Sequence, residues 1–359
     1  MKIENFISYE QPTNYIVHSD QYTKDGQIPV LTAGQSFVLG YTDEEDGIYT
    51  GEPVVIFDDF TTSVQYVDFP FKVKSSAMKI LKNKQNANIK FCYYLLSWLQ
   101  KMPPNHKRQW ISTTSQIDIN LPPIEWQKKI VQKIEAVSNI IKYRKEELKK
   151  LDELVSARFV EMFGNPILNP NGYLKEKIEK HIDLLTGYPF KSEQYIEEGI
   201  NICGGLIIMP QKIKWNECVH WSSVEGFEDY LLNENDIVMA LDRPWISEGF
   251  KMAKVDAEHL PALLIQRTAR IRAIDMNQDY LYYCFINGGF DKHSNVTGSL
   301  VPHISAKDIR SFEIMIPPTE LQKQFADFVH QVDKSKVAVK KALDETQLLF
   351  DSLMQKYFG

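Results

Sequence analysis

The sequence predicts an α+β fold: two mixed α/β bodies with β-cores, separated by two long antiparallel helices that form an intramolecular coiled coil. Three observations predict this pseudo-twofold tandem repeat. A long segment of the sequence occurs twice, both copies have helical periodicity, and short β-type runs precede each copy. The length of 359 residues fits two or three domains.

The repeat is the strongest signal in the sequence. LPPIEWQK at 121–128 recurs as IPPTELQK at 316–323, and the match continues without a gap for 44 residues to a Phe-Gly pair. Lys2-Ile3-Glu4 recurs as Lys177-Ile178-Glu179 at the front of each unit. Residues 165–176 are rich in Asn, Pro and Gly and are typical of a linker.

The end of each unit is predicted to be one long helix. A proline pair precedes each copy, and proline is tolerated in the first turn of a helix. Apolar residues then recur every three or four positions, and neither Gly nor Pro interrupts them. A helix of this length needs a partner for its apolar stripe, and the other copy is the simplest one.

The bodies before the helices have a different character. Short β-type runs occur at 53–57, 64–69, 200–209, 236–241, 269–274 and 312–316, with turn signals between them. Short helices are expected at 87–100 and 278–287. Apart from their two ends, the bodies barely align with each other, which suggests one kind of task performed on two different targets.

Composition and motifs exclude several classes of function. No apolar run approaches the ~18 residues that a membrane span requires. The four cysteines form no CxxC, and we expect reduced thiols and a cytoplasmic location. The sequence has no phosphate loop, GxGxxG or GxSxG motif, and its eight histidines lack metal-ligand spacing. We therefore expect no catalytic residues and no metal.

Two adjacent acidic residues, Asp58 and Asp59, follow the β-type run at 53–57. Asp58 and Asp59 could suggest a metal site, but adjacent residues on a strand point to opposite faces. A structural or turn role is the favoured interpretation.

The sequence resembles the specificity (S) subunits of type I restriction-modification enzymes. The resemblance covers essentially the whole chain. It is based on the two [IL]PP-x-E-x-Q helix starts and on 29–41, 55–81, 187–195, 236–244, 263–271 and 303–309.

The resemblance implies a division of labour. The two target recognition domains would be residues 1–120 and residues 165–315, the second of which includes the linker. The family's conserved spacer helices would be residues 121–164 and 316–359. Each recognition domain would read one half of a split, asymmetric sequence in double-stranded DNA. The helices would set the spacing and dock two methyltransferase (M) subunits, which carry S-adenosylmethionine; this chain would hold no cofactor. Restriction (R) subunits are the further partners that the resemblance implies.

Polar, basic and aromatic residues in loops are the candidate DNA contacts, because such side chains suit base edges and phosphates. For each one alone, a solvated surface or core role is the alternative. The candidates are Gln35, Ser36, Thr61, Thr62, Lys72, Lys74 and Arg108 in the first body, and Tyr188, Lys191, Arg243, Arg267, Lys292, Ser299 and His303 in the second. Arg267, Arg270 and Arg272 lie on a predicted strand, and some of them could instead be structural salt-bridge partners.

The charge balance bears on how such a chain would bind DNA. Its 41 basic and 47 acidic side chains give a net charge of −6. We expect weak binding by the chain alone, with contacts carried by local strips such as 71–90, which contains six lysines and no acidic residue. Other readings stay open: a specificity subunit of a solitary methylation or other phage-defence complex without R, a coiled-coil protein-binding scaffold, or an enzyme with an unrecognised site.

Overall fold

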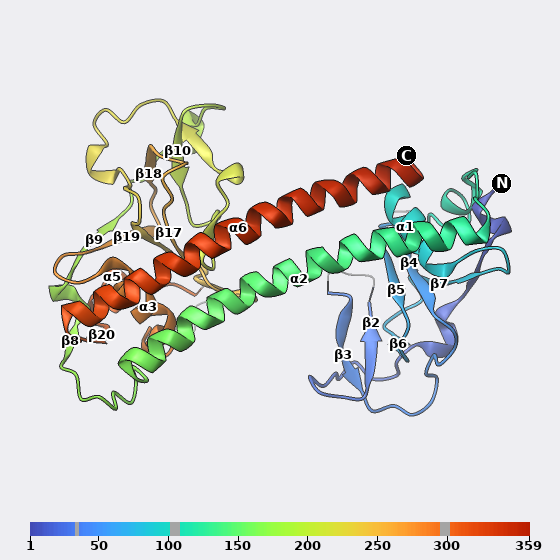
Figure 1. The fold of residues 1–359 in the computed structure, drawn as a ribbon, viewed down its shortest axis with the longest axis horizontal. Coiled ribbons are helices and arrows are strands. Elements are labelled where there is room, and N and C mark those ends of the chain that lie inside the picture. Colours follow the sequence, from blue (N-terminus) through green and yellow to red (C-terminus); the bar gives the residue numbers. More distant parts are fainter. Residues whose placement is uncertain (33–35, 101–107, 295–301) are drawn as a thin grey trace. The chain divides into compact units, whose positions relative to one another are not determined.

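The computed structural model describes residues 1–32, 36–100, 108–294 and 302–359. The chain divides into two compact units. Unit 1 contains Met1–Glu146 and Lys340–Gly359, and unit 2 contains Glu147–Val339. Each unit therefore includes part of both long helices, α2 (Ile124–Phe163) and α6 (Thr319–Phe358) (Figure 1). Both helices begin directly after a proline pair, as predicted.

Unit 1 is built on two sheets. The antiparallel sheet has the order β1-β7-β4-β5, and the mixed sheet has the order β3-β2-β6. Helix α1 (Ile89–Leu99) packs against the antiparallel sheet. The strands are β1 (Ile7–Glu10), β2 (Ile28–Leu31), β3 (Val38–Thr42), β4 (Val54–Asp58), β5 (Val64–Val67), β6 (Lys72–Val73) and β7 (Met78–Asn83).

Unit 2 repeats this plan. Its antiparallel sheet has the order β17-β14-β19-β9, and its mixed sheet has the order β13-β10-β18. In both mixed sheets the central strand has one antiparallel and one parallel neighbour. The strands are β9 (Ile182–Thr186), β10 (Ile200–Cys203), β13 (Val219–Trp221), β14 (Ile237–Ala240), β17 (Met252–Lys254), β18 (Ala262–Leu264) and β19 (Thr268–Ala273).

Smaller elements complete unit 2. Helices α3 (Gln278–Asn287), α4 (Phe290–His293) and α5 (Ala306–Ser311) follow β19. Three two-stranded sheets are formed by β8 (Lys175–Lys177) with β20 (Glu313–Met315), β11 (Ile208–Met209) with β12 (Lys212–Ile213), and β15 (Trp245–Ile246) with β16 (Gly249–Phe250).

The two units thus have the same topology, although the sequences of their bodies barely align. The matched front ends form the same feature in both: Ile3 and Ile178 are fully buried in short 3-10 turns that lead into β1 and β9. Five of the six predicted β-type runs and both short helices are present with shifts of a few residues at their ends. The run 200–209 is instead divided into β10 and β11 by a turn at 204–207. The α+β prediction is confirmed.

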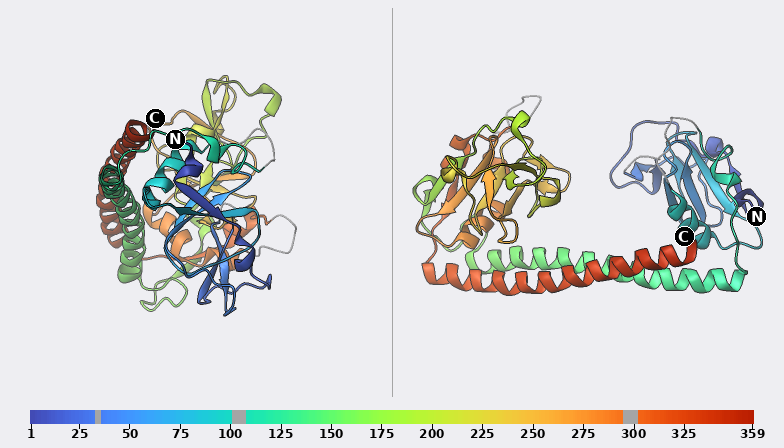
Figure 2. Two further views of the ribbon diagram at one scale, coloured as in Figure 1. Left: turned by 90° about the vertical axis from the view of Figure 1, so that its right-hand side faces the viewer. Right: turned by 90° about the horizontal axis from the view of Figure 1, so that it is seen from above.

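Within each unit the long helices lie side by side and run in opposite directions (Figure 2). In unit 1, Ile130 and Ile134 of α2 share a core with Met354 of α6. In unit 2, Phe159 of α2 packs edge-on against Phe325 of α6, with ring centroids 5.4 Å apart. The apolar stripe of each helix is therefore covered by the other helix and by the body of the unit. No helix in the described part of the chain is long and apolar enough to cross a membrane.

Candidate nucleic-acid interface

The turn after β4 in unit 1 carries Thr61 and Thr62. Asp58 Oδ1 accepts hydrogen bonds from the backbone N–H groups of Phe60 and Thr61, both at 2.7 Å. Thr62 has a left-handed backbone, with φ of 61°, and its side chain is buried. Thr61 is exposed. Only Thr61 of this pair therefore presents its side chain to solvent.

Asp59 joins this turn to Arg108. Its buried carboxylate accepts the backbone N–H of Trp110 at 2.8 Å and pairs with Lys79 at 3.3 Å. The Arg108 Nε lies 4.0 Å from the same carboxylate, and 60% of the arginine side chain is exposed. Asp58 and Asp59 thus have structural roles, and they place Thr61 and Arg108 around one turn.

Lys72 does not fit its predicted role. Its side chain has no exposed surface, and its ammonium lies 2.6 Å from Glu44 Oε2 and donates to Asp46 O at 2.7 Å. An ammonium group buried in this way cannot reach DNA in this conformation, so the prediction of Lys72 as a DNA contact is wrong. Both residues of β6 are buried, so no alternation of polar and apolar residues in the sequence marked Lys72 as an interior side chain.

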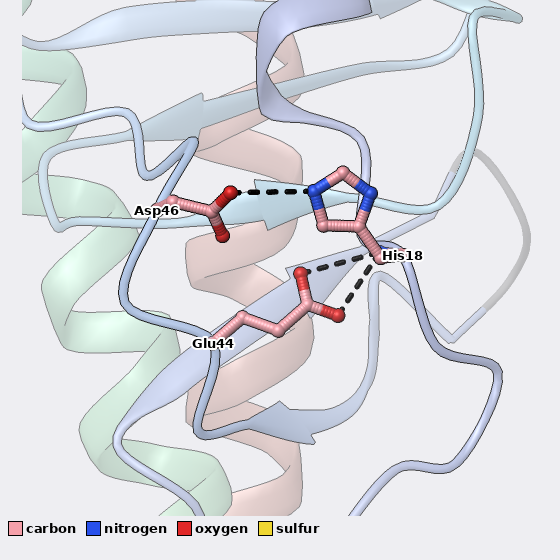
Figure 3. Close-up of side chains that lie close together, drawn as sticks. All are labelled: His18, Glu44 and Asp46. Carbon is pink, nitrogen blue, oxygen red and sulfur yellow. Dashed lines mark hydrogen bonds and ion pairs between the residues drawn. The ribbon is translucent and has the colours of Figure 1, made fainter.

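Around the same lysine lies a group of side chains with metal-ligand chemistry. His18, Glu44 and Asp46 offer ligand atoms within 4.8 Å of one another (Figure 3). His18 Nε2 lies 3.4 Å from Asp46, and the backbone N–H of His18 donates to Glu44. The Lys72 ammonium already supplies the positive charge here, 2.6 Å from Glu44 and 3.7 Å from Asp46. The cluster is therefore explained as an ion-pair network around the buried Lys72 ammonium, with the side chains of His18 and Asp46 exposed at its edge.

The lysine strip 71–90 is also corrected by the structure. Lys74 pairs with Asp20 and donates to the Tyr22 hydroxyl at 2.8 Å, and Lys79 is buried against Asp59. Lys82 forms an ion pair with Glu10, and Lys90 forms one with Glu135. Lys84 donates a hydrogen bond to the backbone carbonyl of Glu4. All six lysines therefore have internal partners, so the strip does not present six unpaired cations.

In unit 2, Tyr188 and Lys191 lie beside an aromatic cluster. The Tyr188 ring is half-buried, with centroids 5.0 Å from Phe190 and from Phe227. Its backbone joins Leu264 and Gln266, which ties this loop to the end of β18. Lys191 is exposed at the start of a 3-10 turn. Tyr188 therefore has a packing role, and Lys191 remains available to a ligand.

Three predicted residues of unit 2 converge on a residue that the prediction missed. Asp242 forms an ion pair with Arg267, Nη1 to Oδ2 3.1 Å, and its Oδ1 lies 2.6 Å from His303 Nδ1. Arg243, the next residue, is exposed and its backbone N–H donates to Pro302. Asp242 lies in the segment 236–244, which contributes to the family resemblance. An acidic side chain, however, gives no sequence signal for DNA binding. Its role became visible only from its partners.

A cavity of about 560 Å³ adjoins this cluster. Asp242, Arg243 and Arg267 line it, together with Lys251. Lys251 is buried and donates to the carbonyl of Gly205. Burial, with a smaller contribution from Arg243, lowers the pKa of Lys251 below its usual value. Among the residues that the structure describes, no carboxylate pairs with this ammonium.

The remaining predicted residues are more isolated. Ser36 is exposed before β3, and Lys292 is exposed on α4. Gln35 and Ser299 lie outside the described residues. Arg270 and Arg272 are structural, since they pair with Asp183 and Asp236 at 2.5 Å each.

Two units of one topology, with different polar side chains at their strand ends, define a modular recognition protein. The family model described as the type I restriction modification DNA specificity domain matches residues 3–153 and 187–346. The chain belongs to this family, as its resemblance predicted.

Individual relatives agree with the family match. The EcoR124I/EcoR124II specificity subunit of Escherichia coli is 30% identical over 361 residues, which cover 93% of this chain and 86% of that protein. The EcoAI specificity subunit of E. coli is 32% identical over 202 residues, covering 52% of this chain and 33% of that protein. The crystal structure of the type I restriction-modification S subunit from M. genitalium covers all of this chain and 95% of its own, with a TM-score of 0.58 and 14% identity. That last likeness concerns the fold.

Proposed function

We propose that this chain is the non-catalytic DNA-specificity subunit of a type I restriction-modification complex. Each unit reads one half of a split, asymmetric sequence in double-stranded DNA. The observation that carries this proposal is the combination of one topology in both units with family matches in each of them.

The division of tasks follows the segments predicted from the sequence. Residues 1–120 and 165–315 act as recognition domains, and 121–164 and 316–359 act as spacer helices that dock two M subunits. The M subunits hold S-adenosylmethionine and methylate the target, and R subunits join them for cleavage. The described cysteines are all free thiols, which supports a reducing cytoplasmic setting.

The contacts that we propose are fewer than the sequence suggested. Exposed members of the predicted set remain candidates: Ser36, Thr61, Lys74, Arg108, Lys191, Arg243, Arg267, Lys292 and His303. Hydroxyl and ammonium groups suit phosphates, and guanidinium and imidazole groups also suit base edges.

A domain exchange tests this function. The full chain is co-expressed with its M subunit, and the methylated sequence is read across a host genome. Replacing residues 1–120 with those of a relative should change the bases of one half-site and leave the other half-site unchanged. If both half-sites changed, or if no sequence-defined methylation depended on the chain, the proposed function would be wrong. Co-purification of an ATP-dependent R subunit then separates a restriction complex from a solitary methylation system.

A further inference from the structure

Two neighbouring strands of unit 2 end at the same place, and each is joined there to an arginine. Strands β14 and β19 pair antiparallel, with Ala240 opposite Thr268. The chain leaves β14 through Leu241 and Asp242 to Arg243, and it enters β19 directly after Arg267. The N–H of Leu241 donates to the Arg267 carbonyl at 2.9 Å, so the pairing continues to the arginine itself.

Both arginines have left-handed backbones. The φ angles are 45° for Arg243 and 64° for Arg267. Such angles are uncommon for residues other than glycine, asparagine and aspartate, and they persist where the surrounding structure enforces them. A glycine would satisfy the backbone at either position, so the presence of arginine indicates that the side chain is needed.

Asp242 connects the two strand ends to a third segment. Asp242 and His303 form an antiparallel bridge, and the N–H of Ile304 donates to Leu241 at 2.8 Å. The Asp242 carboxylate is 29% exposed and contacts the Arg267 guanidinium through one oxygen and the His303 imidazole through the other. One carboxylate therefore orients two donors that come from distant parts of the sequence.

The anchored arginine keeps its other donors available. Asp242 occupies Nη1 of Arg267, while 74% of the arginine side chain is exposed. Guanidinium donors are arranged in a planar fork, and guanine presents two acceptors, O6 and N7, in the major groove. Arg243 and Lys251 line the same cavity as Arg267, so its three basic side chains outnumber the two carboxylates there, Glu217 and Asp242. A net positive charge attracts a polyanion.

Resting on the proposed function, we infer that Arg267 reads a guanine of the half-site recognised by unit 2, with Asp242 as the positioning residue. Asp242 fixes the direction of the guanidinium fork, and it also fixes the imidazole of His303 beside it. The alternative, a phosphate contact by Arg267, predicts a different result in the experiment below.

The test uses the full chain in complex with its M subunit and measures binding to duplexes in which each base pair is varied in turn. Arg267→Lys keeps the charge but removes the fork. It should reduce the preference for guanine at one position by roughly 5- to 150-fold, the range of one bidentate contact. Asp242→Asn should weaken the preference at that same position, since the neutral amide no longer holds both donors.

A modified base isolates the contact further. Replacing the guanine with 7-deazaguanine removes the N7 acceptor and should weaken binding by the unmodified chain. The same replacement should have a smaller effect on Arg267→Lys, because the lysine lacks the planar fork that engages N7 together with O6. Additive effects of the two changes would overturn the inference.

A matched control comes from a second aspartate–histidine pair in unit 2. Asp256 lies 2.6 Å from His259 Nδ1, as Asp242 does from His303, and it does not line the cavity. Asp256→Asn should leave base preference unchanged. Thermal unfolding of each variant shows whether it folds. If Asp242→Asn fails to fold, the guanine contact is tested by Arg267→Lys alone.

The outcomes separate this inference from the proposed function. Equal weakening on every duplex, with unchanged base preference, would assign Arg267 to a phosphate and overturn the guanine reading. Unchanged binding by Arg267→Lys, or relaxation at a position that is not G·C, would also overturn it. Each of these results leaves the proposed function intact, because the unmodified complex would still methylate a defined DNA sequence. Only the absence of such a target would reject the proposed function itself.

Discussion

Gln127 in unit 1 and Gln322 in unit 2 share two hydrogen bonds at equivalent positions of the repeat, and Gln127 also donates to the Asn86 carbonyl at 3.0 Å. Each amide nitrogen donates to a carbonyl of the preceding proline pair, Pro122 at 2.8 Å and Pro317 at 2.9 Å. Each amide oxygen accepts a backbone N–H at 2.8 and 2.9 Å, from Asn88 and Asn277 respectively.

Those two asparagines are themselves helix caps. Asn88 caps α1 by accepting the N–H of Phe91, and Asn277 caps α3 by accepting that of Tyr280. Each glutamine therefore joins the first turn of a long helix to the capped start of a helix in the body. This explains why the Q of the repeated motif is buried in both units, at 0% and 2% exposure.

Replacing either glutamine with leucine should destabilise its own unit. Gln127→Leu leaves partly buried backbone groups of Asn88 and Pro122 without these partners, at a cost on the order of 2 kcal/mol. Urea unfolding gives the total loss, and hydrogen exchange shows which unit opens. Gln132→Leu and Gln324→Leu are matched controls, since both side chains are exposed on the same helices. Equal protection loss in the two units after one substitution would contradict a local role.

The buried pair of Lys72 and Glu44 predicts an acid-sensitive contribution to stability. Burial tends to raise the pKa of Glu44, but hydrogen bonds from Lys72 and from the backbone of Ser19 and His18 outweigh it and lower the pKa below its ordinary 4.5. A carboxylate with a lowered pKa stabilises the fold above its unfolded pKa. That stabilisation is lost as the pH falls below 4.5 and through the folded pKa.

Lys72→Met should cost about 3–5 kcal/mol near neutral pH, because it leaves a largely buried carboxylate without its partner. The variant should also lose less additional stability than the parent between pH 5 and acid, as followed by urea unfolding. Lys74→Met is the matched control, since its partner Asp20 is exposed and such pairs contribute about 0–1 kcal/mol. An equal effect of the two substitutions would argue against the burial of Lys72.

The spacer role of the helices predicts a change in target spacing. Seven residues are removed from α2 within 140–155, with seven removed from the facing part of α6 to keep pairs such as Asp152 with Lys336. A heptad shortens a helix by about 10 Å, which corresponds to about three base pairs of duplex. The methylated sequence should keep its half-site bases and lose about three base pairs between them. Altered half-site bases with an unchanged gap would refute the ruler role.

The charge distribution predicts that tight DNA binding needs the assembled complex. Residues 1–120 carry 11 basic and 13 acidic side chains, and residues 165–315 carry 15 and 21. Five of the six lysines of 71–90 pair with carboxylates of the chain, so this strip releases fewer counterions from DNA than its lysine count suggests. The chain alone should bind weakly, with a shallower dependence of log K on log salt than the complex with M. High-affinity, salt-resistant binding by the isolated chain would contradict this.

The sequence by itself determined the repeat, the extent of both long helices and the family. These features are local or periodic, because a 3.6-residue apolar pattern and a motif such as LPPIEWQK can be recognised without knowing what the segment contacts. The same holds for some of the short strands, such as β4, β5 and β14, whose β-type runs lie between turn signals. Strands β1, β7 and β9 were not predicted.

The tertiary structure decided which side chains are available. Lys72 and Arg267 are both basic residues in polar segments, yet one is fully buried on Glu44 and the other is 74% exposed and anchored by Asp242. It also showed that two bodies with little sequence in common have the same sheet order. The physical reason is that strand pairing joins residues far apart in the chain, and a side chain's partners and burial depend on that pairing.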